Sequence, residues 1–137
     1  MYLPPNSIIA AGPVIIEDGK VLLNRERKSD GTESKWWMFP GGGAEDFDMS
    51  LEEVCCREAK EEMGIDIEII QPLRTLMIPR PDKEGLAILV HYLAKRTSEI
   101  KPGPETLAWD WFPLNQLPEQ CAPNVVAILK DITNENN

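Results

Sequence analysis

Residues 40–65 read PGGGAEDFDMSLEEVCCREAKEEMGI, a glycine-rich turn that leads into a segment rich in carboxylates. Ser50 followed by Glu53 forms a capping box, and Gly64 supplies the left-handed residue that commonly ends a helix. The glycines allow the backbone to approach a ligand closely, because no side chain intervenes. The stretch therefore predicts a glycine loop followed by a helix over residues 51–63.

Two glutamates of this helix lie on the side that its apolar residues mark as buried. At about 100° per residue, one side of the helical wheel collects the apolar residues Leu51, Val54 and Cys55. Glu58 falls between them, Glu62 lies beside it, and Glu61 lies on the flank. Removing such charges from water costs several kcal/mol per ion unless something compensates. A divalent cation is the natural compensation, and hard oxygen ligands suit Mg²⁺ or Mn²⁺.

The last nine residues of this stretch carry a family signature. Residues 57–65, REAKEEMGI, match the Arg-Glu-x-x-Glu-Glu-x-Gly-aliphatic string of the Nudix box, and the upstream glycines match its opening. The chain therefore resembles a Nudix hydrolase. The resemblance implies an α/β fold, a Nudix-like α/β/α sandwich with a mixed β-sheet, in one domain over residues 1–137. It also implies cleavage of a pyrophosphate bond in a nucleoside diphosphate derivative, with Mg²⁺ as the cofactor or Mn²⁺ in its place.

The loop between the glycines and Arg57 departs from the family pattern. Counting forward from Gly42 with the usual spacing of the box reaches Asp48, whereas counting back from Arg57 reaches Met49. The loop thus carries one extra residue, and the accessory glutamate of the family is replaced by one or the other. Arg57 also lies one turn before Glu61, so it can hold that carboxylate or form an ordinary helix salt bridge.

The resemblance assigns roles to the acidic residues. Glu58 and Glu62 are expected as principal metal ligands, Glu61 as a ligand or its support, and the Gly41 carbonyl as a backbone ligand. Removal of a proton from the attacking water falls to a box glutamate, Glu58 or Glu61, or to Glu105 in the loop before the last predicted strand. For Glu105 a plain exposed glutamate is an equal alternative.

Four further side chains are candidates for contact with the substrate, namely Arg25, Arg27, Trp37 and Arg80. Arginine suits phosphate because its fork makes bidentate hydrogen bonds, and a solvated charge is the alternative for all three arginines. Trp37 precedes the glycine turn with the spacing seen in many Nudix proteins. It can shape a nucleobase pocket or pack in the core.

Composition limits the partners and the location of the protein. The chain has 137 residues and a formal charge of −9, which disfavours nucleic acid polymers and anionic membranes. Its three cysteines form no disulfide framework, and no apolar run approaches membrane length. We therefore expect a cytoplasmic protein with a small nucleotide as its partner, either a monomer or a homodimer.

Alternating patterns predict the remaining elements. Strands are expected at residues 7–16, 20–25, 36–39, 65–71, 73–79, 86–95 and 108–112, and a final helix at residues 124–133. Asp18-Gly19 predicts a hairpin between the first two strands. Pro13 predicts that the first strand lies at a sheet edge or contains a bulge.

The substrate itself is less well specified by the sequence. A compact chain suits cleavage of a nucleoside or deoxynucleoside triphosphate to the monophosphate and pyrophosphate. ADP-ribose, dinucleoside polyphosphates and nucleotide sugars are alternatives. A non-catalytic domain that senses nucleotides or binds proteins is an alternative of another class, favoured by the irregular loop and opposed by the complete set of box glutamates.

Overall fold

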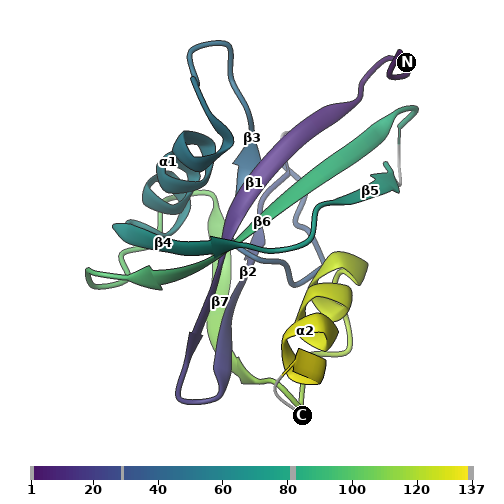
Figure 1. Ribbon diagram of the computed structural model, residues 1–137. Coiled ribbons are helices and arrows are strands. Elements are labelled where there is room, and N and C mark those ends of the chain that lie inside the picture. Colours follow the sequence, from purple (N-terminus) through teal and green to yellow (C-terminus); the bar gives the residue numbers. More distant parts are fainter. Residues whose placement is uncertain (1, 29, 81–82, 136–137) are drawn as a thin grey trace.

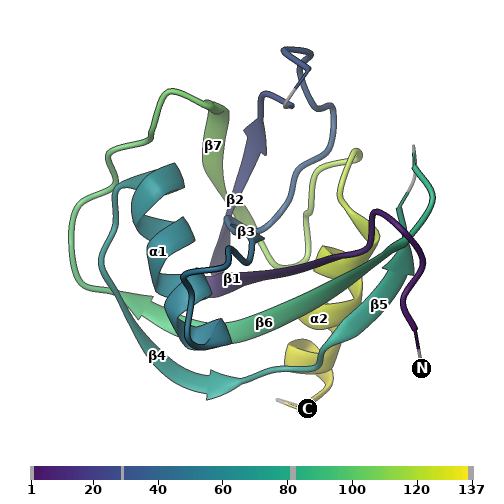
Figure 2. The ribbon, with the colours of Figure 1, turned by 90° about the horizontal axis from the view of Figure 1, so that it is seen from above.

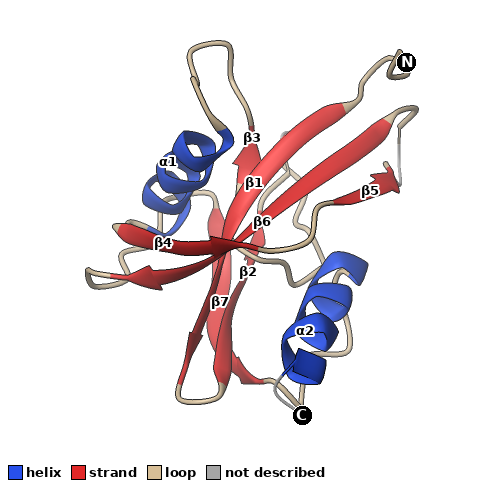
Figure 3. Cartoon of the chain, viewed as in Figure 1, coloured by secondary structure: helices blue, strands red, loops and turns tan. Residues whose placement is uncertain are grey.

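In the computed structural model, which describes residues 2–28, 30–80 and 83–135, a mixed sheet is flanked by two helices (Figure 1; Figure 3). The strands are β1 (Ile8–Glu17), β2 (Lys20–Glu26), β3 (Gly42–Gly43), β4 (Ile67–Pro72), β5 (Leu76–Pro79), β6 (Leu86–Arg96) and β7 (Thr106–Pro113). The helices are α1 (Leu51–Met63) and α2 (Pro123–Glu135). Within the described residues, neither helix has the length and apolarity needed to cross a membrane.

The two helices cover opposite faces of the sheet (Figure 2). Because side chains alternate along a strand, β2 contributes to both cores: Leu22 packs with α1, whereas Val21 and Leu23 pack with α2. The helix residues buried in these cores are Val54, Cys55, Ala59 and Met63 of α1 and Val125, Ile128 and Leu129 of α2. This arrangement confirms the predicted α/β/α sandwich with a mixed sheet.

Strand β1 lies in the middle of the sheet, in the order β4-β6-β1-β2-β7. It pairs with β6 in parallel and turns into β2 through Asp18 and Gly19, which have φ angles of 52° and 75°. Both residues thus take the positive φ values that a tight hairpin turn requires, and the predicted hairpin is confirmed.

The prediction that Pro13 marks an edge strand or a bulge is wrong. Pro13 is fully buried, in an interior strand, opposite Tyr92 of β6. On its other side, β1 pairs with β3 at Ala10 and Ala11 and with β2 from Ile16 onward. Pro13 therefore lies where β1 changes partners, a position at which a residue without an N–H group is tolerated.

The predicted strand at residues 36–39 is replaced by two isolated bridges. Met38 pairs with Asn24 of β2 on one side, and Trp37 pairs with Cys121 on the other. The segment is thus divided between two neighbours and does not extend a single ladder. Its bridge to Asn24 fixes the start of the glycine turn beside the end of β2.

Candidate active site

The boundaries of α1 follow from its capping groups. The Ser50 hydroxyl accepts a hydrogen bond from the Glu53 amide at 3.1 Å, and the Glu53 carboxylate accepts one from the Met49 amide at 2.7 Å. At the other end, Gly64 takes the left-handed conformation with φ of 66°. The capping box and the C-terminal glycine are both as predicted, and they fix the phase of the helix.

That phase buries the acidic residues to different extents. Glu62 is 9% exposed, the Glu58 side chain is 13% exposed, and the Glu61 side chain is 58% exposed. The order agrees with the helical wheel, which places Glu58 and Glu62 inward and Glu61 on the flank. Two carboxylates on one side of α1 are therefore held largely out of water.

Glu62 joins three elements of the fold. Its Oε2 accepts a hydrogen bond from the Gly41 amide at 3.0 Å, and its Oε1 accepts one from Asn24 Nδ2 at 3.1 Å. Asn24 is completely buried on β2. The contacts hold the Glu62 carboxylate between the glycine turn and β2, and each of its oxygens keeps a further lone pair.

Arg57 organises the other acids. It donates to both oxygens of Asp48, at 3.1 and 2.7 Å, to the Gly43 carbonyl at 3.1 Å and to Glu58 Oε1 at 2.9 Å. Its contact with Glu61 is longer, at 3.3 Å. These hydrogen bonds lower the pKa of Asp48 and raise that of Arg57. The guanidinium thus ties the glycine loop to α1 and orients Glu58.

The position of Asp48 resolves the irregular loop. Its carboxylate pairs with Arg57, whereas Met49 is 86% exposed. The extra residue of the loop is therefore accommodated at the surface, where Met49 lies. Asp48 is the acid that pairs with Arg57. Sequence counting alone had left both positions open.

Gly42 makes room for Glu58. A Cβ atom at residue 42 would overlap the Glu58 carboxyl group, whereas one at Gly43 would meet only the Ile9 carbonyl at 3.9 Å. Burial raises the pKa of Glu58, and its hydrogen bond from Arg57 opposes that increase. The glycine turn and the inward acid are packed directly against each other.

The loop before β7 caps the end of α1. Lys101 and Gly103 donate backbone hydrogen bonds to the carbonyls of Met63 and Glu62, both at 2.8 Å, and the Thr106 hydroxyl also donates to Glu62 at 2.9 Å. The loop is thereby anchored at the acidic helix. Glu105 lies within it, and its carbonyl accepts a hydrogen bond from the Arg27 amide at 2.9 Å.

Glu26, at the end of β2, is a site residue that sequence reasoning missed. Burial raises its pKa to about 7, and the charges of Glu58 and Glu105 add to the increase, while a hydrogen bond from Asn24 opposes it. Glu26 therefore lies among the acids of α1 and of the loop before β7. Strand alternation is the sequence signal that could have identified it. Leu22, Asn24 and Glu26 lie on the same face of β2, the face that packs toward α1.

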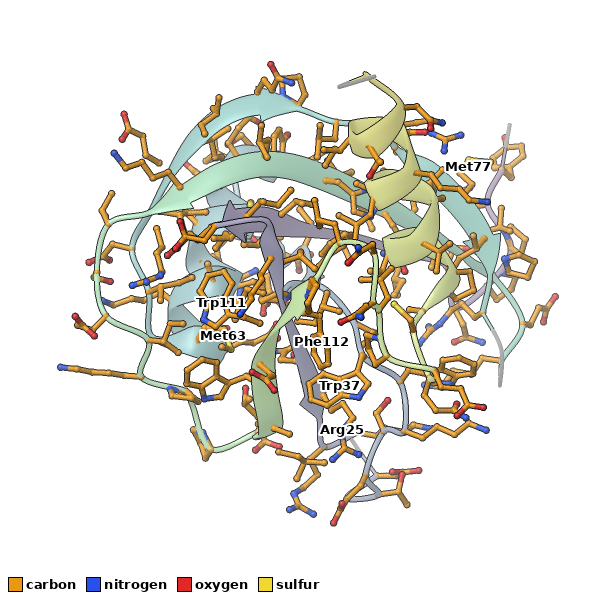
Figure 4. The ribbon with its side chains drawn as sticks, turned by 90° about the horizontal axis from the view of Figure 1, so that it is seen from below. Arg25, Trp37, Met63, Met77, Trp111 and Phe112 are labelled. Atoms are coloured by element: carbon orange, nitrogen blue, oxygen red, sulfur yellow. The ribbon has the colours of Figure 1, made fainter. Side chains whose placement is uncertain are left out.

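Arg25 and Trp37 lie on the other face of the sheet. The Arg25 guanidinium stands 5.3 Å from the centre of the Trp37 ring, which meets Phe112 edge to face at 4.8 Å (Figure 4). Trp37 packs against the core under α2. These contacts correspond to the core-packing alternative for Trp37, and a substrate role for either residue stays a prediction.

Arg80 holds the N-terminal segment in place. Its guanidinium donates to the Asn6 carbonyl at 2.7 Å, and its amide donates to the Gly85 carbonyl at 3.1 Å. It does not line the cavities beside the glycine turn. The structure therefore does not bring it together with the acidic residues.

Two adjoining cavities open beside the glycine turn and the end of β2. One, of about 290 Å³, runs along Gly41–Gly43 and is mostly apolar; the other, of about 620 Å³, is lined by the basic residues Arg27, Lys28 and Lys35 together with Trp36. Glu26 and Met38 line both cavities. A larger cavity of about 880 Å³ lies at the far ends of β1 and β6, and none of the box residues lines it. The two adjoining cavities, which share Glu26, are therefore the candidates for binding a substrate beside the glycine turn.

The donor set at the acidic helix suits a hard divalent cation. It consists of carboxylate, backbone carbonyl and amide oxygens, and the buried Asn24 Oδ1 has no hydrogen-bond partner. As the side chains stand, no three His, Cys, Asp or Glu residues in the described part of the chain enclose an ion. Arg57 donates to one oxygen of Glu58, and the other oxygen packs against Gly42. The chemistry of this donor set fits the cation.

The fold and this site define a Nudix domain. The model of the NUDIX domain family matches residues 7–131, and the chain therefore belongs to the Nudix family and is a Nudix hydrolase. Enzymes of this family generally use divalent metal ions.

Individual relatives support the assignment. The chain is 32% identical over 120 residues to an ADP-ribose pyrophosphatase of Methanocaldococcus jannaschii, covering 87% of this chain and 68% of that protein. It is 29% identical over 119 residues to a MutT-like protein of Streptomyces ambofaciens, covering 87% and 71%. The crystal structure of a MutT NUDIX hydrolase from Burkholderia pseudomallei superposes with a TM-score of 0.78 at 26% identity, covering 91% of this chain and 97% of that one.

Substitution of Gly42 tests the packing of the glycine turn. We expect Gly42→Ala to fold, because Glu58 can move its carboxyl group away, and to lose about tenfold or more in Mn²⁺ affinity and in activity, since the moved carboxylate is displaced from the site. Gly43→Ala is the matched control, because its Cβ meets open space apart from one distant carbonyl. Calorimetric titration with Mn²⁺ measures the difference, and equal affinities in the two variants would contradict this packing.

Proposed function

We propose that the protein hydrolyses a nucleoside or deoxynucleoside triphosphate to the monophosphate and pyrophosphate, in the presence of Mg²⁺. The observation that carries the proposal is an apolar cavity along the glycine turn that adjoins a cavity with three basic residues, the two meeting at Glu26 and Met38. Such a triphosphate has a flat aromatic base at one end and a highly charged tail at the other. The bond to be broken lies between them.

The apolar cavity suits a nucleobase. Its walls include Phe39, Leu89 and Val90, and it opens along the glycine turn. Besides Glu26, two polar side chains, His91 and Asn124, stand in the wall and hydrogen-bond to each other at 3.1 Å. A flat ring with a polar edge matches an apolar pocket that has few polar groups.

The basic cavity suits the leaving pyrophosphate. Arg27, Lys28 and Lys35 line it in a chain whose formal charge is −9. A local group of cations on an acidic protein attracts the most highly charged part of a substrate. This feature favours a triphosphate over ADP-ribose, because ADP-ribose carries a neutral ribose in place of the terminal phosphate.

The residues of α1 and of the glycine turn hold the cofactor in this proposal. Glu58 and Glu62 are its principal ligands, with Glu61 and the Gly41 carbonyl completing the set. When bound, Mg²⁺ neutralises the phosphates and lowers the pKa of a bound water. Arg57 orients Glu58 through a hydrogen bond of 2.9 Å. Glu105, or a box glutamate, accepts the proton of the attacking water.

ADP-ribose is the second candidate substrate. It is favoured by the relative from Methanocaldococcus jannaschii, whose name states that activity. Dinucleoside polyphosphates and nucleotide sugars follow. Against a non-catalytic role stands the complete set of Arg57, Glu58, Glu61 and Glu62. We further propose a cytoplasmic location and either a monomeric or a homodimeric state.

A panel of nucleotides tests the proposal. Nucleoside triphosphates, ADP-ribose, a dinucleoside tetraphosphate and a nucleotide sugar are each incubated with Mg²⁺ or Mn²⁺, and products are separated chromatographically. Monophosphate plus pyrophosphate from triphosphates is the expected result. Preferential release of AMP from ADP-ribose would identify ADP-ribose, the second candidate, as the substrate. If no compound were hydrolysed in a metal-dependent manner, the proposed enzymatic function would be wrong.

Substitution of Arg27 tests the role of the basic cavity. We expect Arg27→Gln to raise KM for a triphosphate by about tenfold while changing kcat little, because its loss removes one charged contact to the tail of the substrate. The exposed Lys130 on α2 provides the control, and Lys130→Gln removes the same charge far from the cavity. Equal KM values in both variants would contradict the proposed position of the pyrophosphate.

A further inference from the structure

We propose that Glu26 is a further metal ligand, which β2 supplies to the ion held by α1. The inference rests on the proposed metal-dependent function and deepens it, because the Nudix box contributes no residue from β2. Four observations carry it: the position of Glu26, the junction between the elements, the charges around Glu26 and an unpartnered buried oxygen.

Glu26 stands in the wall of the cavity that runs along Gly41–Gly43. At the same turn, Glu58 packs directly against Gly42. The glycine turn, which carries the expected carbonyl ligand at Gly41, thus has one carboxylate packed against it from α1 and another beside it from β2. An ion held at this turn would have both carboxylates within its surroundings.

The end of β2 is joined to the end of α1 through β7. Glu26 is the register partner of Thr106, and the Thr106 hydroxyl donates to the Glu62 carbonyl at 2.9 Å. The next residue, Arg27, donates its amide to the Glu105 carbonyl at 2.9 Å. These hydrogen bonds fix the backbone of Glu26 relative to both acidic segments, so its proximity does not depend on a flexible loop.

The charges around Glu26 are negative and suit a cation. Its acidic neighbours are Glu58 and Glu105, and the Asn24 amide is the neutral polar group that acts on it. The ion pairs found among the described residues do not include Glu26, and Arg57 is already occupied by Asp48, Glu58 and Glu61. Half-buried carboxylates of like charge are stabilised by a proton or by a positive partner, and the ion pairs of the described residues supply no positive partner for Glu26.

The buried amide of Asn24 points independently to a ligand. Its Nδ2 donates to Glu62 Oε1 at 3.1 Å, which fixes the amide beside that carboxylate, yet its Oδ1 is buried without a partner. Native proteins rarely leave such an atom unsatisfied. A hard cation, with its coordinated water, accepts an amide oxygen as readily as carboxylates. One ion therefore accounts for the unpartnered oxygen and for the charge on Glu26.

Metal binding in the absence of nucleotide tests the inference. The full-length protein and the variants Glu26→Gln, Glu26→Asp and Glu33→Gln are titrated with Mn²⁺ by calorimetry, and free Mn²⁺ is followed by electron paramagnetic resonance. Glu33→Gln is the matched control, because Glu33 is an exposed carboxylate in the wall of the neighbouring cavity. We expect Glu26→Gln to weaken Mn²⁺ binding by about tenfold or more relative to this control, and Glu26→Asp to weaken it by less.

The outcomes separate the inference from the function. Mn²⁺ affinity in Glu26→Gln within about twofold of the control would overturn the role of Glu26, even if the native protein binds Mn²⁺ and hydrolyses nucleotides. Failure of the native protein to bind Mn²⁺ at all would overturn both. A weakened affinity in Glu26→Gln together with hydrolysis by the native protein supports both. Circular dichroism of each variant establishes that the fold is retained.

Discussion

Glu62→Gln is expected to lower kcat/KM by about 10²- to 10³-fold or more, with little change in secondary structure. The carboxylate accepts hydrogen bonds from two donors, the Gly41 amide and Asn24 Nδ2. A glutamine can accept only one of them, because its NH₂ group then faces a donor. The substitution removes a negative charge at the expected ion and loosens the glycine turn. Steady-state kinetics with saturating Mg²⁺ measures the loss.

The exposure of the acids on α1 predicts a graded series. Glu61→Gln is expected to cost less than Glu62→Gln, because the Glu61 side chain is 58% exposed and its contact with Arg57 is long. Glu68→Gln, at an exposed position of β4, is expected to retain native activity. If Glu62→Gln retained native turnover, the assignment of Glu62 as a ligand would be wrong. If Glu61→Gln were the more damaging variant, the ion would lie further out on the helix.

Local interactions explain why so much of α1 could be predicted. A capping box, a terminal glycine and an apolar stripe all act within a few residues, so the sequence contains the information needed to place Glu58 and Glu62 inward. The loop before the helix is different. Whether Asp48 or Met49 contacts Arg57 depends on the path of the loop between the glycines and the helix. Counting residues along the sequence cannot determine that path.

Contacts between distant segments explain what sequence reasoning missed. Residue chemistry favours Arg25 and Arg27, because arginine suits phosphate, whereas the alternate residues Asn24 and Glu26 face the acidic helix. Their role becomes visible only when β2 is known to lie under the end of α1. Pro13 gives the same lesson, because its position in an interior strand depends on a change of partners along β1.

The stability of the metal-free protein should depend on pH through Glu26. Its pKa is about 7 in the folded protein and near the ordinary value of 4.5 when unfolded. Between these values the folded state binds more protons than the unfolded state, so this group makes the protein less stable as pH rises. This loss of stability is absent at pH values below the pKa of the unfolded state. It is complete above the pKa of the folded state, where it reaches on the order of 3 kcal/mol.

Comparison with Glu26→Gln isolates this contribution, because the other titrating groups are common to both proteins. In EDTA, the free energy of unfolding from urea titrations should be similar for the two proteins near pH 4.5. Above pH 7, Glu26→Gln should be the more stable. A difference that stays constant from pH 5 to pH 8 would contradict the raised pKa, and Glu33→Gln controls for the loss of one negative charge.

Saturating Mn²⁺ should narrow this difference. An ion that binds the folded state alone stabilises it by a free energy that grows with the logarithm of its affinity, and the native protein is expected to bind Mn²⁺ more tightly than Glu26→Gln. A tenfold difference in affinity corresponds to about 1.4 kcal/mol in favour of the native protein, which offsets part of the penalty from the Glu26 charge. At pH 8, replacing EDTA with Mn²⁺ should therefore raise the urea midpoint of the native protein more than that of the variant. If Mn²⁺ raised the two midpoints equally, Glu26 would be a buried acid without a role in binding the ion.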